Sequence, residues 1–200
     1  QAHEALRSEL LDQIGVLAKS VADAAIVLQV IAGHDPCDST SLDVSVPDYS
    51  AALTGDIRGL RVGLPKEYFE YSVEDSVKNA FLKTVENLKK AGVEFVDVSL
   101  PNTSAAVPVY YMIATSEASS NLSRYDGIRY GFRASSPQGD WGNLDELYSE
   151  TRGQGFGHEV KRRILLGTFA LSSGYYDAYY LKASQVRRMI QNDFINAFKS

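Results

Sequence analysis

Arg163 is the side chain in this sequence whose position most clearly requires a chemical partner. It belongs to the basic run Lys161-Arg162-Arg163 within an otherwise apolar helical stretch, where burial of an unpaired guanidinium would be costly. Either a protein carboxylate pairs with it, or it binds the carboxylate of a ligand, because its planar fork can donate two parallel hydrogen bonds. Residue types alone favour the structural ion pair and leave the ligand site open as the alternative.

Two tandem serine pairs could in principle supply a nucleophile, at residues 119–120 and 172–173. No lysine or histidine stands at a spacing that would activate either pair. Serine is strongly preferred at helix ends. We therefore interpret both pairs as capping or helix-surface residues.

The glycine cluster at residues 153–157 precedes a helix and could bind an anion on unpaired backbone amides. It lacks the preceding strand that gives a phosphate-binding loop its context, so the sequence predicts a tight turn there. His158 is interpreted as a surface residue at the start of the next helix. The tyrosine pairs at 175–176 and 179–180 repeat every four residues, so one member of each is expected to pack and the other to face solvent.

The composition excludes several classes of protein. The net charge is −5 and the densest basic cluster is residues 161–163, so there is no concentrated basic face for a phosphate backbone. The single cysteine, Cys37, excludes an internal disulfide, and the three histidines share no metal-ligand spacing. No apolar run approaches the roughly 18 to 20 residues of a membrane helix. The sequence predicts a soluble, cytoplasmic chain that needs neither a metal nor another cofactor.

These side chains need a scaffold, and the first half of the sequence predicts a β-α-β unit. A strand is expected at residues 60–65, buried and apolar, and a second at 93–100. Between them a helix opens near Ser72 and ends at Gly92, and its expected core face is Val77, Phe81, Val85 and Leu88. Such a unit normally makes a right-handed parallel crossover. An earlier helix at residues 21–31 is predicted from the capping box that begins at Ser20.

The second half is predicted to be mostly helical. Helices are expected at residues 107–122, 144–152, 158–171 and 173–197, with a long ordered loop at 121–143. The fold class is therefore α/β, with a short mixed sheet, several flanking helices and a helix-rich second half.

Several runs of this sequence resemble amidase-signature enzymes, in the stretch that follows their nucleophile region. These runs are LDQIG at 11–15, SVADAA at 20–25, AGHDP at 32–36 and DSTS at 38–41. The longer runs at 116–131 and 155–180 are similar to the A subunits of tRNA-dependent amidotransferases, and the resemblance covers nearly all of residues 11–200. It implies part of the amidase-signature fold over that range, with residues 1–10 as a leader of uncertain origin. Mild departures are Val16, where proline is usual, and Cys37, where lysine is common.

The resemblance also implies an activity for the parent protein. Such A subunits hydrolyse glutamine, the B subunit uses the ammonia in an ATP-dependent ligase reaction of protein biosynthesis, and the C subunit helps to hold the other two together. Transfer RNA is then met only indirectly. The family's Lys–cis-Ser–Ser triad lies upstream of the matched stretch and has no counterpart here, so the resemblance implies no catalytic residue and an inactive fragment.

Two substrate-binding residues carry over by resemblance. Arg163 matches an arginine that binds the α-carboxylate of glutamine, with Arg162 as the weaker match. Tyr110 matches a pocket tyrosine, with Tyr111 as the alternative. Two other functions stay open: a non-catalytic folding or interaction module, whose uncovered edges favour self-association, and part of a free-standing amidase.

Overall fold

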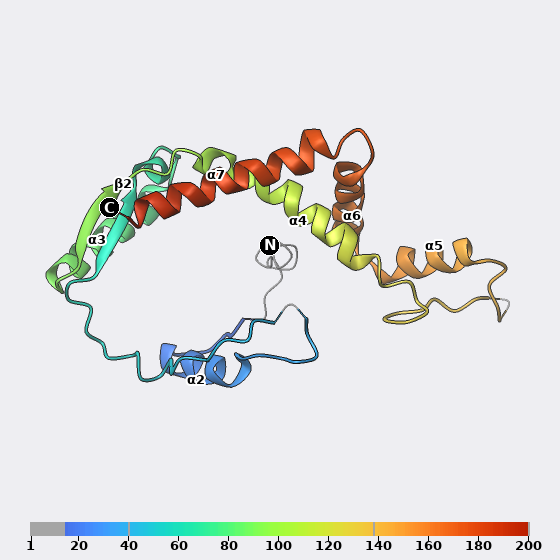
Figure 1. The fold of residues 1–200 in the computed structure, drawn as a ribbon, viewed down its shortest axis with the longest axis horizontal. Helices are drawn as coiled ribbons and strands as arrows, with labels where there is room; N and C mark the ends of the chain where they lie inside the picture. The colour runs from blue at the N-terminus through green and yellow to red at the C-terminus, as the bar shows by residue number, and fades with distance from the viewer. Residues whose placement is uncertain (1–14, 40, 138, 200) are drawn as a thin grey trace. The chain divides into compact units, whose positions relative to one another are not determined.

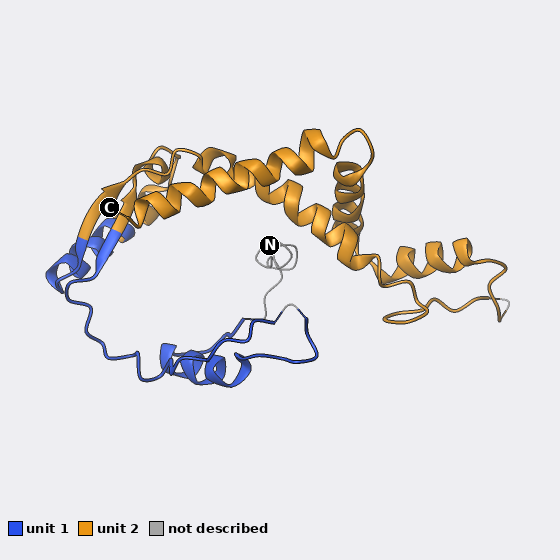
Figure 2. Ribbon diagram, viewed as in Figure 1, with its two compact units in different colours: residues 1–62, 81–94 blue, residues 63–80, 95–200 orange. Residues whose placement is uncertain are grey.

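The computed structural model describes residues 15–39, 41–137 and 139–199. The chain forms two compact units, one of residues 1–62 with 81–94 and the other of residues 63–80 with 95–200 (Figure 2). The leader predicted at residues 1–10 lies outside the described residues. The boundary between units passes through the segment of residues 61–98.

The first unit contains helix α2 (Val21–Ile31), whose bounds match the prediction. The amide of Asp23 donates to Ser20 Oγ at 3.1 Å, which satisfies one of the unpaired amides of the first turn. Gly33 follows the helix at a φ of +142°, in the region that glycine adopts readily. The segment beyond is tied back to α2, because the amide of Tyr49 donates to Gln29 Oε1 at 2.8 Å.

The predicted β-α-β unit is confirmed. Strands β1 (Arg61–Pro65) and β2 (Glu94–Val98) pair, and between them lie the short helix η1 (Lys66–Phe69) and helix α3 (Asp75–Lys90). The amide of Glu94 donates to the carbonyl of Leu60 at 2.8 Å. Further along both strands, a Cβ on Gly63 would lie 3.1 Å from the Val98 methyls. The register advances in the same direction on both strands, so they are parallel.

The expected burial of this unit is only partly correct. Val85 of α3 and Val93 are buried, but Val77 is 56% exposed and the first three residues of β1 are exposed as well. The reason is physical: in the part of the chain that the structure describes, the sheet holds two strands only, so β1 has no neighbour on its other edge. The apolar pattern correctly predicted the strand, but it overestimated how much of β1 is buried.

The second unit is mostly helical, and α4 and α7 form its buried cluster. After β2, its helices are η2 (Thr103–Ala105), α4 (Ala106–Leu122), α5 (Leu144–Gly155), α6 (His158–Leu171), η3 (Asp177–Leu181) and α7 (Lys182–Ala197). Helix α4 packs against both α6 and α7 (Figure 1). Val109 and Ile113 of α4 meet Ala183 of α7 in the buried cluster, and Val186 and Ile190 pack around it.

A carboxylate joins the two ends of this helical region. Asp193 of α7 accepts the backbone amide of Asn102 at 2.9 Å and the side-chain amide of the same residue at 3.0 Å. Asn102 immediately precedes η2, which leads into α4. The interaction satisfies an amide near the start of these helices, and it ties α7 to them.

Two local predictions in this unit are wrong. The glycine cluster is not one tight turn, because α5 continues through Gly155 and Gly157 is already the N-cap of α6. Residues 173–197 are not a single α-helix either: η3 is a π-helical turn that precedes α7. Tyr175 and Tyr179, four residues apart, both contact Phe169, at 4.4 and 5.5 Å between ring centroids. One member of each tyrosine pair therefore packs against α6, as expected, while Tyr176 and Tyr180 contact each other with ring centroids 5.2 Å apart.

The fold class stands as an α/β arrangement with a helix-rich second half. The segment between α4 and α5 contains neither helix nor strand in its described residues, as predicted. Among the helices that the structure describes, none combines the length and apolar character needed to cross a membrane.

Candidate functional site

Helices α4 and α6 cross at very close range because of one glycine. A Cβ added to Gly167 of α6 would overlap the backbone carbonyl of Thr115 in α4. Thr115 and Ser116 are almost fully buried at this crossing. Their hydroxyls donate within α4, to the carbonyls of Tyr111 at 2.6 Å and Met112 at 2.7 Å. Both buried hydroxyls are thus satisfied, and the helices can approach without leaving either one unpaired.

The crossing places Arg163 and Tyr110 next to each other. Arg163 lies one turn before Gly167 on α6, and Tyr110 lies one turn into α4. Hydrogen bonds to the carboxylate of Glu159 and then to the Tyr110 side chain raise the pKa of the Arg163 guanidinium. The two residues that the sequence singled out from separate regions are therefore brought together.

Arg163 is not buried as the apolar stretch suggested. Its side chain is 40% exposed, and its Nε donates to Glu159 Oε1 at 3.1 Å. The partner stands four residues earlier on the same helix, which is a favourable spacing for an ion pair. The structural pairing anticipated from residue types is present, and it is half-exposed because the guanidinium lies at the edge of the helix contact.

Glu159 serves two arginines at once. Its other oxygen, Oε2, accepts Nη1 of Arg162 at 3.3 Å. Hydrogen bonds from Arg163 first and Arg162 second lower the pKa of the Glu159 carboxyl. The Arg162 side chain is 64% exposed, more than that of Arg163, so Arg163 is the arginine of the two that lies closer to α4.

Tyr110 and Tyr111 are neighbours whose rings meet edge to face, with centroids 5.5 Å apart and planes at 70°. Both are close to half exposed, at 48% and 46%. Tyr110 is the residue whose side chain acts on the pKa of Arg163. This favours Tyr110 over Tyr111 as the partner of Arg163, while the binding of a ligand by either stays a prediction.

The arrangement is suited to binding a carboxylate. A guanidinium and a phenol hydroxyl side by side supply several donors for a carboxylate group. Two of the candidate serines are engaged otherwise: Ser119 Oγ lies 2.8 Å from Thr168 Oγ1, and Ser172 Oγ donates to the carbonyl of Phe169 at 2.7 Å. Both contacts fit the helix-surface and capping roles expected of these serines.

Sequence reasoning missed the residues that hold the loop between α4 and α5. Arg152 of α5 donates Nη1 to the carbonyls of Leu122 at 3.0 Å and Tyr125 at 3.1 Å. Its guanidinium also lies 5.0 Å from the ring centroid of Phe156. Further along the loop, the amide of Ala134 donates to Thr151 Oγ1 at 3.2 Å. Adjacent Thr151 and Arg152 near the end of α5 were the sequence feature from which these contacts could have been predicted.

The loop carries one tight turn of its own. The amides of Ile128 and Arg129 donate to Asp126 Oδ1, at 2.8 and 3.2 Å, and these bonds lower the pKa of the Asp126 carboxyl. Gly127 adopts a φ of +77° within this turn, a conformation that suits glycine. Residues 126–129 of the predicted ordered loop thus form a hydrogen-bonded turn.

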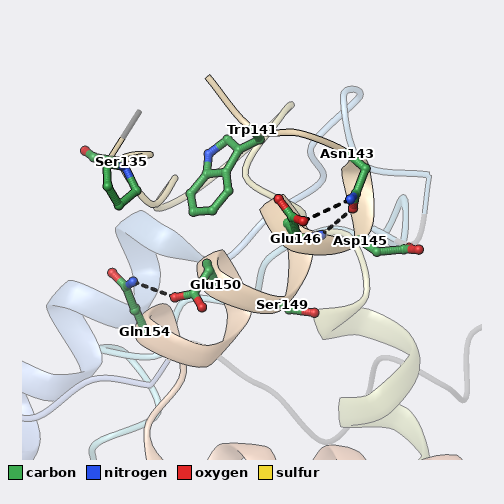
Figure 3. A pocket seen from close by; sticks show the side chains of 9 residues that line it. Ser135, Trp141, Asn143, Asp145, Glu146, Ser149, Glu150 and Gln154 are labelled. Carbon is green, nitrogen blue, oxygen red and sulfur yellow. Dashed lines mark hydrogen bonds between the residues drawn. The ribbon is translucent and has the colours of Figure 1, made fainter. Parts of the chain in front are cut away.

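A separate hollow of about 650 Å³ lies on α5 (Figure 3). Two of its carboxylates are engaged in local hydrogen bonds: Glu146 Oε1 accepts from the side-chain amide of Asn143 at 3.1 Å, and Glu150 accepts from Gln154 Nε2 at 3.0 Å. Within the described ranges no group of three or more histidine, cysteine or acidic residues could hold a metal ion. The hollow does not include Tyr110 or Arg163, so we treat the helix crossing as the candidate site.

Comparison with known proteins gives the chain its context. The sequence profile of the family described as Amidase matches residues 4–200. The chain is 58% identical over 189 residues to the A subunit of the glutamyl-tRNA(Gln) amidotransferase of Pelobacter propionicus, covering 94% of this chain. It is 56% identical over 188 residues to the corresponding protein of Brevibacillus brevis, again covering 94% of this chain. The chain spans about 38% of the length of these curated relatives.

Solved structures agree on the fold. The crystal structure of the glutamyl-tRNA(Gln) amidotransferase A subunit from Thermotoga maritima matches with a TM-score of 0.64 and 32% identity, over 92% of this chain and 34% of that one. A bacterial aryl acylamidase described as belonging to the amidase signature enzymes matches with a TM-score of 0.66 over 92% of this chain and 34% of that one. Its identity is 19%, so it supports the fold alone.

Proposed function

Because this chain belongs to the amidase family, we propose that it is the glutamine-positioning part of the A subunit of a glutamyl-tRNA(Gln) amidotransferase. The observation that carries the proposal is the Arg163 guanidinium on α6, which is held through Nε by Glu159 at 3.1 Å while its side chain stays 40% exposed. The identity to curated A subunits supports the choice of this activity over that of a free-standing amidase.

In this proposal Arg163 binds the α-carboxylate of glutamine. A guanidinium can donate two parallel hydrogen bonds to a carboxylate, and the half-exposed side chain remains reachable by a ligand. The Tyr110 hydroxyl oxygen can accept from the guanidinium and donate its own proton to the same carboxylate. The substrate is thereby oriented by its amino-acid end, which leaves its side-chain amide to the chemical step.

The parent complex would supply what these residues do not. We infer that the B and C subunits are the partners, that tRNA is met through the B subunit, and that the complex works in the cytoplasm. Positioning alone supplies no chemical step, so these 200 residues by themselves are expected to release no ammonia from glutamine. Ammonia release by the purified chain that is lost after Arg163→Ala would contradict this expectation, whereas release that persists in the variant would indicate a contaminating glutaminase.

The direct test is calorimetric titration of the chain with L-glutamine. Loss of a hydrogen-bonded charge costs about 1.5–3 kcal/mol, so Arg163→Ala should raise the Kd about 10- to 150-fold. Tyr110→Phe should raise it about 2- to 10-fold, since one neutral hydrogen bond is lost. The α-carboxamide analogue of glutamine, which lacks the carboxylate, should bind unsubstituted chain and Arg163→Ala equally weakly.

A matched control is available on α7. Arg188 is an exposed arginine whose Nη1 donates to Gln191 Oε1 at 3.2 Å, so Arg188→Ala removes one arginine of the same kind away from the site. Its Kd for glutamine should equal that of the unsubstituted chain. Equal affinities of Arg163→Ala and Arg188→Ala would refute the assigned role of Arg163.

A second function, an interaction module, is favoured by the exposed apolar side chains. Leu165 of α6 is 71% exposed and Val30 of α2 is 79% exposed, and exposed apolar surface promotes association. Size-exclusion chromatography with light scattering separates the two proposals. A monodisperse monomer that binds glutamine supports the positioning role, whereas a self-associated chain without affinity for glutamine supports the module.

A further inference from the structure

The ion pair between Glu159 and Arg163 uses one particular edge of the guanidinium. The bond runs from Nε of Arg163 to Glu159 Oε1 at 3.1 Å. A guanidinium carries five N–H donors in a fixed planar fork, so a bond at Nε restrains the plane and direction of the whole group. The terminal nitrogens, Nη1 and Nη2, form the opposite edge, which matches the two oxygens of a carboxylate.

Glu159 is itself held in place from two sides. Its Oε2 accepts Nη1 of Arg162 at 3.3 Å, so the carboxylate cannot turn away from Arg163 without breaking a second ion pair. It also lies in the first turn of α6, which begins at His158, where the unpaired amides of the helix favour a negative charge. The second arginine partly neutralises Glu159, which limits its repulsion of an incoming carboxylate.

We propose that Glu159 is a positioning residue for glutamine: it fixes Arg163 through Nε and so directs the Nη edge, beside Tyr110, toward the α-carboxylate of the substrate. This inference rests on the proposed function of Arg163. It adds that the ion pair and the ligand site coexist on one guanidinium, because each uses a different edge. Arg162 then acts as the support of Glu159 and contacts no substrate.

The physical consequence is a smaller ordering cost on binding. Fixing a long, rotamer-rich side chain at a binding site costs about 0.5–1.5 kcal/mol, and Glu159 would meet that cost before the ligand arrives. Glu159→Ala should therefore raise the Kd for L-glutamine about 2- to 10-fold. Glu159→Gln keeps an oxygen that accepts Nε–H, so its Kd should stay within about twofold of the unsubstituted chain.

Nuclear magnetic resonance of the arginine side chains gives a readout that a general loss of stability would not reproduce. The Nε–H signal of Arg163 should be protected from exchange with water in the unsubstituted chain and in Glu159→Gln. It should shift and exchange faster in Glu159→Ala. Glu150→Ala is the matched control, because Glu150 is a helix-surface carboxylate that pairs with Gln154 on α5. It should change neither the signal nor the Kd.

The outcomes separate this inference from the proposed function. If Arg163→Ala abolishes glutamine binding while Glu159→Ala binds normally, the role of Glu159 is overturned and that of Arg163 stands. Tighter binding by both Glu159 variants would identify Glu159 as a competitor and also overturn the inference. A chain that binds no glutamine at all overturns both. Should Glu159→Ala fail to fold, Glu159→Asp is the replacement variant, because its carboxylate is one methylene farther from Arg163. Normal affinity for glutamine in Glu159→Asp counts against the inference, and weakened affinity supports it.

Discussion

Helices α2 and α4 are both rich in apolar residues, yet they are buried to very different degrees. In α2 only Ala25 is buried, and Val21 and Val30 are 72% and 79% exposed. In α4 the deepest side chains are the polar Thr115 and Ser116, at 2% and 1% exposed. An apolar pattern thus predicts where a helix forms, whereas burial depends on a partner that can approach. At α4 that partner is available because α6 carries a glycine at the contact.

The strongest test of this comparison is Gly167→Ala. The new methyl group would overlap the Thr115 carbonyl, so the helices must separate. Overpacking of this kind typically costs about 1–3 kcal/mol and occasionally more. We expect a loss of at least about 2 kcal/mol in urea unfolding, together with weaker glutamine binding as Tyr110 and Arg163 move apart.

Gly153→Ala is the matched control for that substitution. Gly153 is also helical, and no atom lies within 4 Å of the position that its Cβ would occupy. Alanine is preferred over glycine in a helix interior by about 1 kcal/mol, so this variant should be as stable as the unsubstituted chain or more so. Equal losses of stability in Gly153→Ala and Gly167→Ala would show that the close approach of α4 and α6 does not explain the effect of the substitution.

The next largest effect is expected at Asp193. Asp193→Ala removes the acceptor for both amides of Asn102, and hydrogen bonds to a charged group contribute about 1.5–3 kcal/mol. Because Asn102 and Asp193 are only partly buried, water can replace some of the lost hydrogen bonding. We therefore expect the free energy of unfolding, measured in urea, to fall by about 1–2 kcal/mol. Asn192→Ala, at the neighbouring exposed position on α7, should be neutral; a comparable loss there would refute the role of Asp193.

A smaller and more local effect is expected at Ser20. Ser20→Ala removes the oxygen that accepts the Asp23 amide, and loss of an N-cap costs about 1 kcal/mol. Amide hydrogen exchange should accelerate in the first turn of α2 and stay unchanged in α4. Lys19→Ala serves as the control, because it lies next to the N-cap Ser20 and leaves the capping oxygen in place, so exchange in α2 should not change. Uniform acceleration in both helices would show that α2 and α4 unfold as one.

The smallest effect is expected at Val30. Val30→Ala alters a side chain that is 79% exposed, so the free energy of unfolding should change by less than about 0.5 kcal/mol. The matched change in α4 is Ile113→Val, at a position 5% exposed, which should cost about 0.5–1.5 kcal/mol. A larger loss at Val30 than at Ile113 would reverse the comparison between the two helices.

Local signals in the sequence accounted for most element boundaries. Ser20 predicted the start of α2, and the apolar periodicity predicted α6 with its observed bounds. The exposed face of β1 was not predictable, because a strand's own residues do not reveal how many neighbours it has. The π turn at Asp177 was missed because its residues favour an α-helix equally well.

The candidate site shows the same division between local and long-range information. The pairing of Glu159 with Arg163 follows from a spacing of four residues on one helix and could have been inferred from the sequence. The meeting of Arg163 with Tyr110 depends on how two helices cross, and only the family resemblance had linked these residues. Gly167 was interpreted as part of an apolar stretch, since nothing in its sequence neighbours indicates a helix contact.

The π-helical turn at Asp177–Leu181 sets the rotational phase of everything that follows it. Such a turn accommodates one residue more than an α-helical turn. Deleting a single residue there would restore the ordinary winding and rotate all later side chains by about 100° around the helix axis. Asp193 would then point away from Asn102, and the apolar stripe of α7 would leave Val109 and Ile113. That one inserted residue keeps the apolar face of α7 directed at α4.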